Sequence, residues 1–270
     1  MENYLNIKNK VIVISGAAGF LANKLIIEFL KNGAEVFGID NDYKQLMTQY
    51  KRIKKICPNN KFHIIKCNIT KESEVKKSIK NIFKLSKSID VLINNAATKT
   101  KNLKNFFKSF ENYRLKDWNE VMNVNINGAF LISREISKYM IKKKSGNIIS
   151  IASIQGVVGN DKRLYKDSKF RGIQMGSPAV YSTSKSALIG LTRYLSTYLG
   201  EYNIRANSIS PGGIRSEQNR EFIKNYSKKV PLNRMGLTNE IVDTILFLSS
   251  EKSNYITGQN LIVDGGYTSW

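Results

Sequence analysis

The sequence is poor in the residues from which many catalytic and structural sites are built. Its 270 residues include two cysteines, Cys57 and Cys67, one histidine, His63, and four prolines. These residues cannot supply a disulfide framework or a Cys/His zinc site, and a histidine-based catalytic triad is nearly excluded. We therefore expect no metal centre, and any acid–base chemistry must come from tyrosine, lysine, serine or a carboxylate.

Long apolar runs are missing as well. No stretch approaches the roughly 18 apolar residues that a membrane span requires. The start, Met-Glu-Asn-Tyr, does not have the basic-then-apolar profile of a secretory signal. We expect a cytoplasmic protein that makes no contact with a membrane.

Acidic residues are scarce: 21 Asp and Glu stand against 43 Lys and Arg, which gives a formal net charge of +22. Such an excess is found in proteins that bind nucleic acid, membrane surfaces or anionic substrates. The lysines are spread through every segment together with many Asn and Ile residues. This distribution favours solvated surface charge, and it makes nucleic-acid binding the weaker alternative.

Short β-branched runs alternate with longer helical patterns along the chain. The expected strands are 11–15, 35–39, 62–66, 89–93, 147–151, 204–209 and 260–263, and the expected helices are 20–32, 42–56, 71–86, 117–141, 180–201 and 238–249. The alternation predicts an α/β fold, a single-domain doubly wound parallel sheet of Rossmann type with about seven strands and helices on both faces. We expect this domain to span residues 1–270, with Gly33 ending the first helix, Thr70 capping the third and Gly146 preceding the fifth strand.

A glycine-rich segment, Ser15 to Ala22, directly follows the first expected strand and opens the first helix. Glycines there permit a tight turn and a close approach of the backbone to a pyrophosphate, which sits on the helix N-terminus. Asp40 ends the second strand, where a carboxylate accepts hydrogen bonds from an adenosine ribose and repels a 2′-phosphate. The pair predicts binding of NAD over NADP. The alternatives are an ordinary glycine-rich turn and an aspartate that caps the next turn.

Tyr181 and Lys185 lie one helical turn apart in the expected helix 180–201, so both side chains project from one face. A neighbouring ammonium stabilises a phenolate, and we expect Lys185 to lower the pKa of Tyr181 from its ordinary value of about 10. The phenol could then exchange a proton with a substrate hydroxyl. As an isolated pair the two residues would also fit a solvent-facing helix.

A series of motifs occurs in one order along the chain: Gly16-x-x-Gly19, Asn94-Asn95-Ala96-Ala97, Asn125, Ser153, Tyr181-x-x-x-Lys185 and Pro211-Gly212-Gly213-Ile214. Together they resemble the classical short-chain dehydrogenases/reductases over nearly the whole chain. The resemblance implies a catalytic set. Tyr181 would donate or accept the proton, and Lys185 would lower the pKa of Tyr181 and hold the nicotinamide ribose. Ser153 would polarise the reacting carbonyl, and Asn125 would anchor a water in a proton relay.

The same resemblance implies an NAD site and a homo-oligomer, a dimer or tetramer in which helices 117–141 and 180–201 pack against symmetry mates. The implied cofactor residues are Gly16, Ala18, Gly19, Phe20, Leu21, Asp40, Asn68, Ile69, Asn95, Ala96, Ala97, Tyr181, Lys185, Pro211, Gly212, Gly213, Ile214 and Ser216. Three of these depart from the family pattern. Phe20 replaces a usual glycine, Asn68 stands where an aspartate often contacts adenine, and Ala97 replaces the last glycine of its motif.

An insert at Gln155 to Pro178 makes the separation of Ser153 and Tyr181 about twice the usual gap of the family. It is similar to inserts in oxidoreductases of bacterial flagellin-modification and surface-sugar pathways. We expect a mobile basic lid or wall over the substrate cleft, in which Arg163, Lys166, Lys169 or Arg171 binds an anionic group of a sugar substrate. The alternative is a solvated excursion that covers a neighbouring subunit.

The predicted function is that of an NAD-dependent oxidoreductase that transfers a hydride to or from a secondary alcohol or ketone. The expected substrate is a sugar, phosphosugar or nucleotide-sugar derivative used in glycan or flagellin modification. One alternative is an extended-type sugar-nucleotide epimerase or dehydratase, which usually needs a longer C-terminal substrate domain. The other is a non-catalytic dinucleotide or nucleic-acid binding protein, which the joint presence of Asn125, Ser153, Tyr181 and Lys185 disfavours.

Overall fold

Seven parallel strands form the central sheet of the protein, shown here as a computed structural model that describes residues 5–270. In spatial order the strands are β3, β2, β1, β4, β5, β8 and β9. Their bounds are β1 Val11–Ser15, β2 Glu35–Asp40, β3 Phe62–Lys66, β4 Val91–Asn94, β5 Gly146–Ile151, β8 Ile204–Pro211 and β9 Asn260–Val263. The predicted doubly wound α/β fold in one domain is confirmed, and each expected strand overlaps an observed one.

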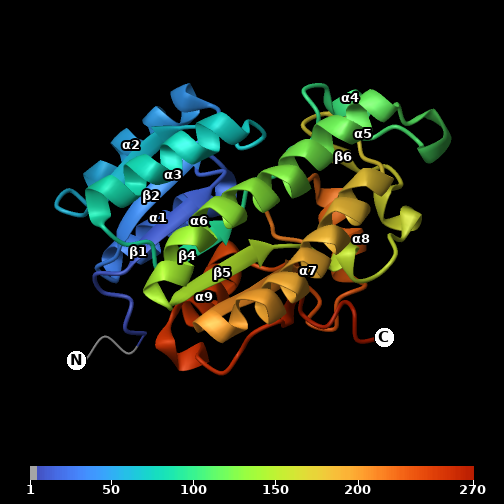
Figure 1. Cartoon of the computed structure of the whole chain (residues 1–270). Helices are drawn as coiled ribbons and strands as arrows, with labels where there is room; N and C mark the ends of the chain where they lie inside the picture. Colours follow the sequence, from blue (N-terminus) through green and yellow to red (C-terminus); the bar gives the residue numbers. More distant parts are fainter. Residues whose placement is uncertain (1–4) are drawn as a thin grey trace.

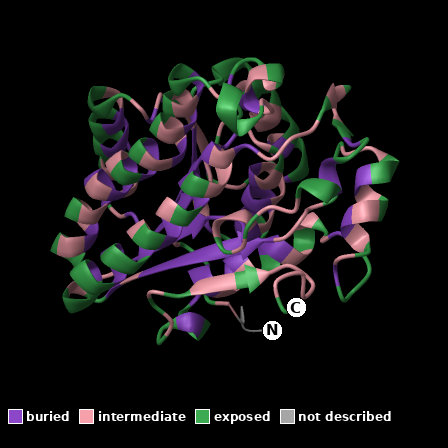
Figure 2. Ribbon diagram, turned by 90° about the vertical axis from the view of Figure 1, so that its right-hand side faces the viewer, coloured by how far each residue is buried: buried purple, intermediate pink, exposed green. Residues whose placement is uncertain are grey.

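Helices cover both faces of this sheet (Figure 1). One layer contains α1 Phe20–Lys31, α2 Tyr43–Ile56 and α9 Thr238–Ser249, and the other contains α3 Glu72–Ser86, α6 Ala129–Lys143 and α7 Ala179–Leu199. Along β1, Ile12 and Ile14 belong to one hydrophobic core, whereas Val11 and Val13 belong to the other. Both faces of the strand are therefore buried, as Figure 2 shows, which explains the continuous apolar runs in the sequence.

The predicted helix 117–141 is present, but it is not α-helical throughout. The structure has α5 Leu115–Met122, a π-helix at Asn123–Gly128, and then α6. The interrupting residues are Asn, Val, Ile and Gly, which have weak helix propensity and so tolerate the wider turn. Because π turns inside helices frequently mark functional sites, the position of Asn125 within this one is informative.

Two of the predicted helix boundaries have different outcomes. Gly33 follows Asn32, the C-cap of α1, and has a φ of +78°, as expected of a glycine just beyond a helix. Thr70 does not cap the third helix, because Lys71 occupies that position and the Thr70 hydroxyl instead donates to Asn68 Oδ1 at 2.9 Å. Gly146 is the first residue of β5 rather than the residue before it.

The structure contains several short elements that the sequence did not predict. α4 Leu103–Phe106 lies after β4, and α8 Arg220–Ser227 lies after β8. The insert carries a small hairpin of β6 Lys169–Phe170 and β7 Ile173–Gln174. Its turn residues, Arg171 and Gly172, have φ values of +50° and +76°, the positive angles that a two-residue type I′ hairpin requires.

The insert is anchored to the rest of the chain by its own apolar side chains. Leu164 and Tyr165 are buried in one cluster with Phe222 and Tyr226 of α8. Asp161 of the insert forms an ion pair with Lys229, which follows α8. Of the two predicted forms, a lid or a wall, the structure therefore shows a packed wall.

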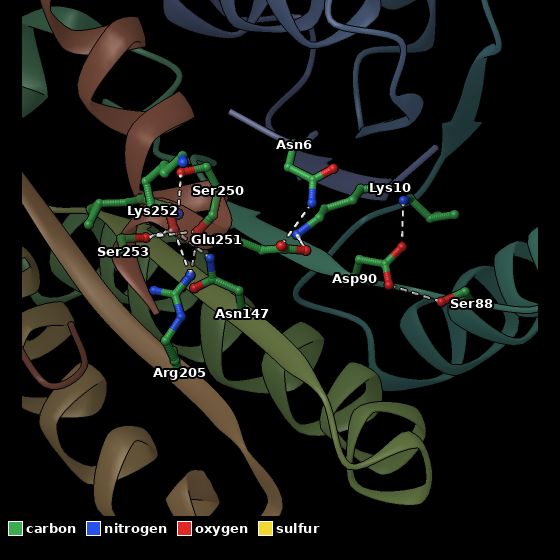
Figure 3. Close-up of polar contacts among 12 residues, drawn as sticks. Asn6, Lys10, Ser88, Asp90, Asn147, Arg205, Ser250, Glu251, Lys252 and Ser253 are labelled. Atoms are coloured by element: carbon green, nitrogen blue, oxygen red, sulfur yellow. Dashed lines mark hydrogen bonds and ion pairs between the residues drawn. The ribbon is translucent and has the colours of Figure 1, made fainter. Parts of the chain in front are cut away.

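Polar contacts connect residues at the amino ends of the parallel strands (Figure 3). Arg205 donates to the carbonyl groups of Leu248, Ser250 and Ile256, around the C-terminus of α9. Burial lowers the pKa of this guanidinium to about 10. At the same ends of the strands, Asp90, which precedes β4, accepts a hydrogen bond from Val11 N at 2.7 Å. Because these polar groups are hydrogen-bonded to one another, they stabilise the fold. We therefore look for a ligand site at the carboxyl ends of the strands.

The first prediction concerns Gly156, in the turn after β5. A Cβ added there would lie 2.7 Å from Lys185 C and 2.8 Å from Ser186 N, both backbone atoms of α7. We expect Gly156→Ala to push the turn away from α7 and to lower the free energy of unfolding by about 1–3 kcal/mol. Urea denaturation of the two proteins measures the difference.

Gly159→Ala is the matched control, because Gly159 is exposed and an added Cβ would meet nothing within 4 Å. We expect its effect on the free energy of unfolding to stay within about 1 kcal/mol of zero. An equal loss in both variants would contradict the role given to the close contact at Gly156.

Candidate active site

A cleft of about 820 Å³ lies at the carboxyl ends of the parallel strands. Residues that follow β4, β5 and β8 line it, together with the insert. The strand order reverses direction between β1 and β4, and doubly wound sheets bind ligands in the crevice at this reversal. The cleft is therefore the candidate active site.

Ser153, Tyr181 and Lys185 come together in this cleft although the insert separates them in the sequence. Ser153 follows β5, whereas Tyr181 and Lys185 lie one turn apart on α7. The Ser153 hydroxyl hydrogen-bonds the Tyr181 oxygen. Lys185 Nζ lies 5.7 Å from the centroid of the Tyr181 ring. The arrangement places two hydroxyl groups and one ammonium around a single point of the cleft wall.

Lys185 is a buried cation held by a neutral partner. Its side chain donates from Nζ to the Ile151 carbonyl oxygen at 2.6 Å, and the residue is only 3% exposed. Because burial removes hydration from the charged form, it lowers the pKa of Lys185 to about 8. The amine of Lys185 therefore loses its proton at a lower pH than an ordinary lysine does.

The predicted lowering of the Tyr181 pKa is wrong for this structure. Burial of the phenol raises its pKa, and the hydrogen bond from Ser153 opposes that effect only in part. Lys185 does not offset the effect of burial, because its ammonium is directed to the Ile151 carbonyl and its own pKa is lowered by burial. Tyr181 is accordingly protonated at neutral pH and suited to donate a proton.

Asn125 is fully buried beneath the cleft, inside the π turn. Its Oδ1 accepts from Thr98 N at 3.0 Å, and its Nδ2 donates to Ser184 Oγ at 3.0 Å. These bonds tie the loop after β4 to α7 between Tyr181 and Lys185. The structure therefore gives Asn125 a positioning role, and its predicted part in a water relay stays a prediction.

Apart from Tyr181 and Lys185 on α7, the residues expected to hold NAD lie at or just beyond the carboxyl ends of strands. Gly16, Ala18, Gly19, Phe20 and Leu21 follow β1, Asp40 ends β2, Asn68 and Ile69 follow β3, Asn95, Ala96 and Ala97 follow β4, and Pro211, Gly212, Gly213, Ile214 and Ser216 end or follow β8. The part of this set that lines the cleft directly comprises Phe20, Leu21, Asn95, Ala97, Pro211, Gly212, Gly213, Ile214 and Ser216.

The local geometry fits a dinucleotide. Gly16 has a φ of +67°, and a Cβ on it would lie 2.6 Å from Ala96 Cα, so the loops after β1 and β4 approach as closely as a glycine permits. Gly19 precedes the first turn of α1, which consists of uncharged residues, and this helix N-terminus suits an anion such as a pyrophosphate. Asp40 Oδ2 accepts from Ala18 N at 2.9 Å, which places a carboxylate beside the loop.

The basic residues of the insert are placed differently from expectation. Arg163 and Lys166 line a separate surface groove beside α8, and Arg163 is paired with Asp161. Lys169 is exposed and does not line the cleft described above. Of the four predicted substrate cations, Arg171 alone lines the cleft, because the hairpin turns its tip toward the opening. The prediction for the other three is therefore corrected.

Sequence reasoning missed several residues that line the cleft. These are Lys99, Phe106 and Phe107 after β4, Tyr165 and Phe170 in the insert, Phe222 and Tyr226 on α8, and Tyr267 near the end of the chain. A signal for α8 was available, because Asn219 caps a helix whose apolar residues Phe222 and Tyr226 are spaced one turn apart. Nothing comparable in the sequence identified Lys99.

Searches for two other kinds of site gave negative results over the described part of the chain. Within residues 5–270, no group of three or more His, Cys, Asp or Glu side chains is arranged to hold a metal ion. Of the helices described, none is both long and apolar enough to cross a membrane.

Comparison with known proteins agrees with this geometry. The family model described as enoyl-(acyl carrier protein) reductase matches residues 16–268. A 3-oxoacyl-[acyl-carrier-protein] reductase of Buchnera aphidicola is 30% identical, over 97% of this chain and 98% of its own. An NAD-dependent glycerol dehydrogenase of Listeria innocua is 29% identical, over 97% of this chain and 95% of its own.

Solved structures give the same result. A short-chain dehydrogenase from Leptospira borgpetersenii, crystallised with bound NAD+, is 35% identical and superposes with a TM-score of 0.82, covering 97% of this chain and 93% of its own. A short-chain dehydrogenase/reductase from Mycobacterium marinum is 26% identical with a TM-score of 0.84, covering 99% of each chain. The chain therefore belongs to the classical short-chain dehydrogenase/reductase family of oxidoreductases, which act on CH–OH groups.

Proposed function

We propose that this protein is an NAD-dependent oxidoreductase that interconverts a secondary alcohol and a ketone. The observation that carries the proposal is the Ser153–Tyr181 hydrogen bond beside the buried ammonium of Lys185, at one end of the cleft. This arrangement offers a proton donor, a second hydroxyl for the substrate oxygen and a cation that can stabilise a phenolate.

Each side chain has a separate task in the reduction. The Ser153 hydroxyl donates a hydrogen bond to the substrate carbonyl oxygen and so polarises the carbonyl. Tyr181 donates its proton to the same oxygen as the carbonyl carbon is reduced, and the Lys185 ammonium stabilises the phenolate that remains. When bound, NAD in its reduced form supplies the hydride. In the oxidation the proton moves from the alcohol to Tyr181.

The preference for NAD is proposed from Asp40. Its carboxylate lies beside Ala18 N, where the ribose of the adenosine would meet the loop after β1. Asp42, the N-cap of α2, adds a second carboxylate next to it. Two negative charges at this place oppose a 2′-phosphate. The bound NAD+ of the Leptospira borgpetersenii relative supports the same choice.

For the substrate we propose a sugar derivative, on the strength of the insert that borders the cleft. The names of the relatives favour a second candidate, a 3-oxoacyl thioester, because the reductase of Buchnera aphidicola matches nearly the whole chain. The two candidates are separated by turnover. Purified protein is supplied with phosphosugars, nucleotide sugars, glycerol and 3-oxoacyl thioesters, each with NAD(H) and NADP(H), and the absorbance of the reduced cofactor is followed.

We also propose that the protein is a cytoplasmic homo-oligomer. Exposed aromatic side chains on the outer surfaces of α6 and α7 support the assembly: Phe130 is 45%, Tyr194 59% and Tyr198 55% exposed. Burial of such side chains against a second copy would stabilise a dimer or tetramer. The free thiols of Cys57 and Cys67 are compatible with a reducing compartment.

The central prediction for the mechanism is that Tyr181→Phe lowers kcat by about 10² to 10⁴, because general acid–base catalysis is lost. We expect the dissociation constant for NAD to change little, since the hydroxyl acts on the substrate. Tyr194→Phe removes a hydroxyl from the exposed side of the same helix and serves as the control. A Tyr181→Phe enzyme with the activity of the control would contradict the mechanism.

A second prediction uses the lowered pKa of Lys185. With a pKa of about 8 in the folded protein and about 10.4 when unfolded, the unfolded state binds more protons between these pH values. The stability of the wild type therefore increases as the pH rises from 8 toward 10, and below pH 8 the buried charge is destabilising.

Lys185→Met removes this charge with little change in helix propensity. At pH 7 we expect the variant to be more stable than the wild type by up to about 3 kcal/mol, although it is inactive. The difference should shrink between pH 8 and pH 10. Urea denaturation at both ends of this range measures it, and a variant less stable than the wild type at pH 7 would contradict the argument.

The third prediction is that Asp40→Ala narrows the gap between the NAD and NADP dissociation constants by weakening NAD binding and removing the repulsion of the 2′-phosphate. Glu35→Ala, at the other end of the same strand, is the control. Tighter binding of NADP than NAD by the wild type, in a fluorescence titration of the reduced cofactors, is the result that would overturn the assignment.

A further inference from the structure

Lys99 places an uncompensated positive charge in the substrate part of the cleft. It lies beyond β4, in the loop that continues from Ala97, and it lines the cleft together with the catalytic residues. Within residues 5–270, no acceptor lies within hydrogen-bond or ion-pair distance of its ammonium. Its closest described contact is the Phe170 ring, whose centroid is 3.8 Å from Nζ. An aromatic face attracts a cation without cancelling its charge.

The ring beneath Lys99 is held in place by the insert. Phe170 ends β6, and it forms a β-bridge with Gln218 of the segment after β8. The neighbouring backbone is tied down as well, because Lys169 N donates to Asn219 Oδ1 at 3.1 Å. Three segments that are far apart in the sequence therefore meet here: the loop after β4, the insert, and the segment after β8. Figure 1 labels β6 at this end of the molecule.

A second cation stands next to the first. Arg171 at the hairpin tip pairs with Glu217 at 2.6 Å, and both side chains are more than half exposed. An exposed ion pair of this kind is weak, so an incoming anion can compete with Glu217 for the guanidinium. Desolvation lowers the pKa of Lys99, the charge of Arg171 lowers it further, and the charge of Glu217 raises it. Lys99 and the Arg171–Glu217 pair therefore act on the same part of the cleft.

The charges of the residues that line the cleft also favour an anionic ligand. Its titratable cations are Lys99, Arg171 and Lys185, whereas Glu217 is the single carboxylate among the described residues that line it. Lys185 is engaged with the reacting end of the site, so Lys99 and Arg171 are left for a different part of the substrate. The cleft is also lined by an aromatic cluster that offers no competing charge, formed by Tyr165, Phe222, Tyr226 and Tyr267.

We propose that Lys99, together with Arg171, binds an anionic group, a carboxylate or a phosphate, on the substrate whose carbonyl meets Ser153 and Tyr181. The inference rests on the proposed function and adds a charge requirement to its substrate. It also moves the expected anion site from the outer insert residues to the loop after β4. Glu217 then acts against the anion, because it occupies Arg171 when no anion is bound.

The test uses matched pairs of ketones with NADH as the reductant. Dihydroxyacetone phosphate is compared with dihydroxyacetone, and 4-oxopentanoate with its methyl ester, so that phosphate and carboxylate are examined separately. For the pair that carries the right anion, we expect the wild type to have a KM at least about tenfold lower for the charged ketone. Added NaCl should raise that KM and leave the KM of the neutral ketone nearly unchanged.

Three variants assign the effect to residues. Lys99→Met should raise the KM ratio of charged to neutral ketone by about tenfold or more. Lys101→Met makes the same charge change at an exposed lysine outside the cleft and should leave the ratio unchanged. Glu217→Gln frees Arg171 and should lower the KM for the charged ketone by about threefold, an effect opposite in sign to that of Lys99→Met.

The outcomes separate this inference from the function on which it rests. If no ketone of either pair is reduced although NADH binds, the proposed function and the inference are both overturned. If neutral and charged ketones are reduced with similar KM values, or if Lys99→Met and Lys101→Met change the ratio equally, the inference alone is overturned. Opposite shifts in Lys99→Met and Glu217→Gln support it, because a merely structural role for either residue would not produce them.

Discussion

The close contact between Gly156 and the backbone of α7 is the constraint on which the site depends. It brings the turn after β5 against the helix at Lys185 and Ser186, and the Ser186 hydroxyl donates to the Gly156 carbonyl at 2.9 Å. Ser153 and Tyr181 belong to these two segments, so their hydrogen bond follows from the packing of the backbones. The insert leaves the contact undisturbed because it has its own apolar cluster with α8.

Burial sets the electrostatics of the same site. It raises the pKa of Tyr181 and lowers that of Lys185 to about 8, so the phenol keeps its proton and the ammonium is held at a cost in stability. A side chain that costs stability where it also does chemistry is typical of an active site. The cleft as a whole stays positive, because Glu217 is the one carboxylate among its described lining residues. The overall charge of +22 thus has a local counterpart in the substrate region.

The sequence predicted the sheet well because its central strands, such as β1 and β4, are buried on both faces and are continuous apolar runs rich in β-branched residues. The order of the motifs predicted that Ser153 would meet Tyr181 and Lys185. The interruption by the π turn around Asn125 was not predictable from periodicity, since apolar spacing hardly changes across it. The cations of the cleft depend on where the hairpin tip and the loop after β4 lie in space, which explains why Arg163, Lys166 and Lys169 were expected and Lys99 was not.

A crystal structure of the protein with NAD+ tests the central claim most directly, because the claim is a spatial one. The account predicts that the hydroxyl groups of the adenosine ribose lie within hydrogen-bond distance of the Asp40 carboxylate. It also predicts that the nicotinamide ring lies in the cleft beside Ser153 and Tyr181, with the loop after β1 around the pyrophosphate. A dinucleotide bound elsewhere, or one whose nicotinamide is directed away from Tyr181, would contradict it.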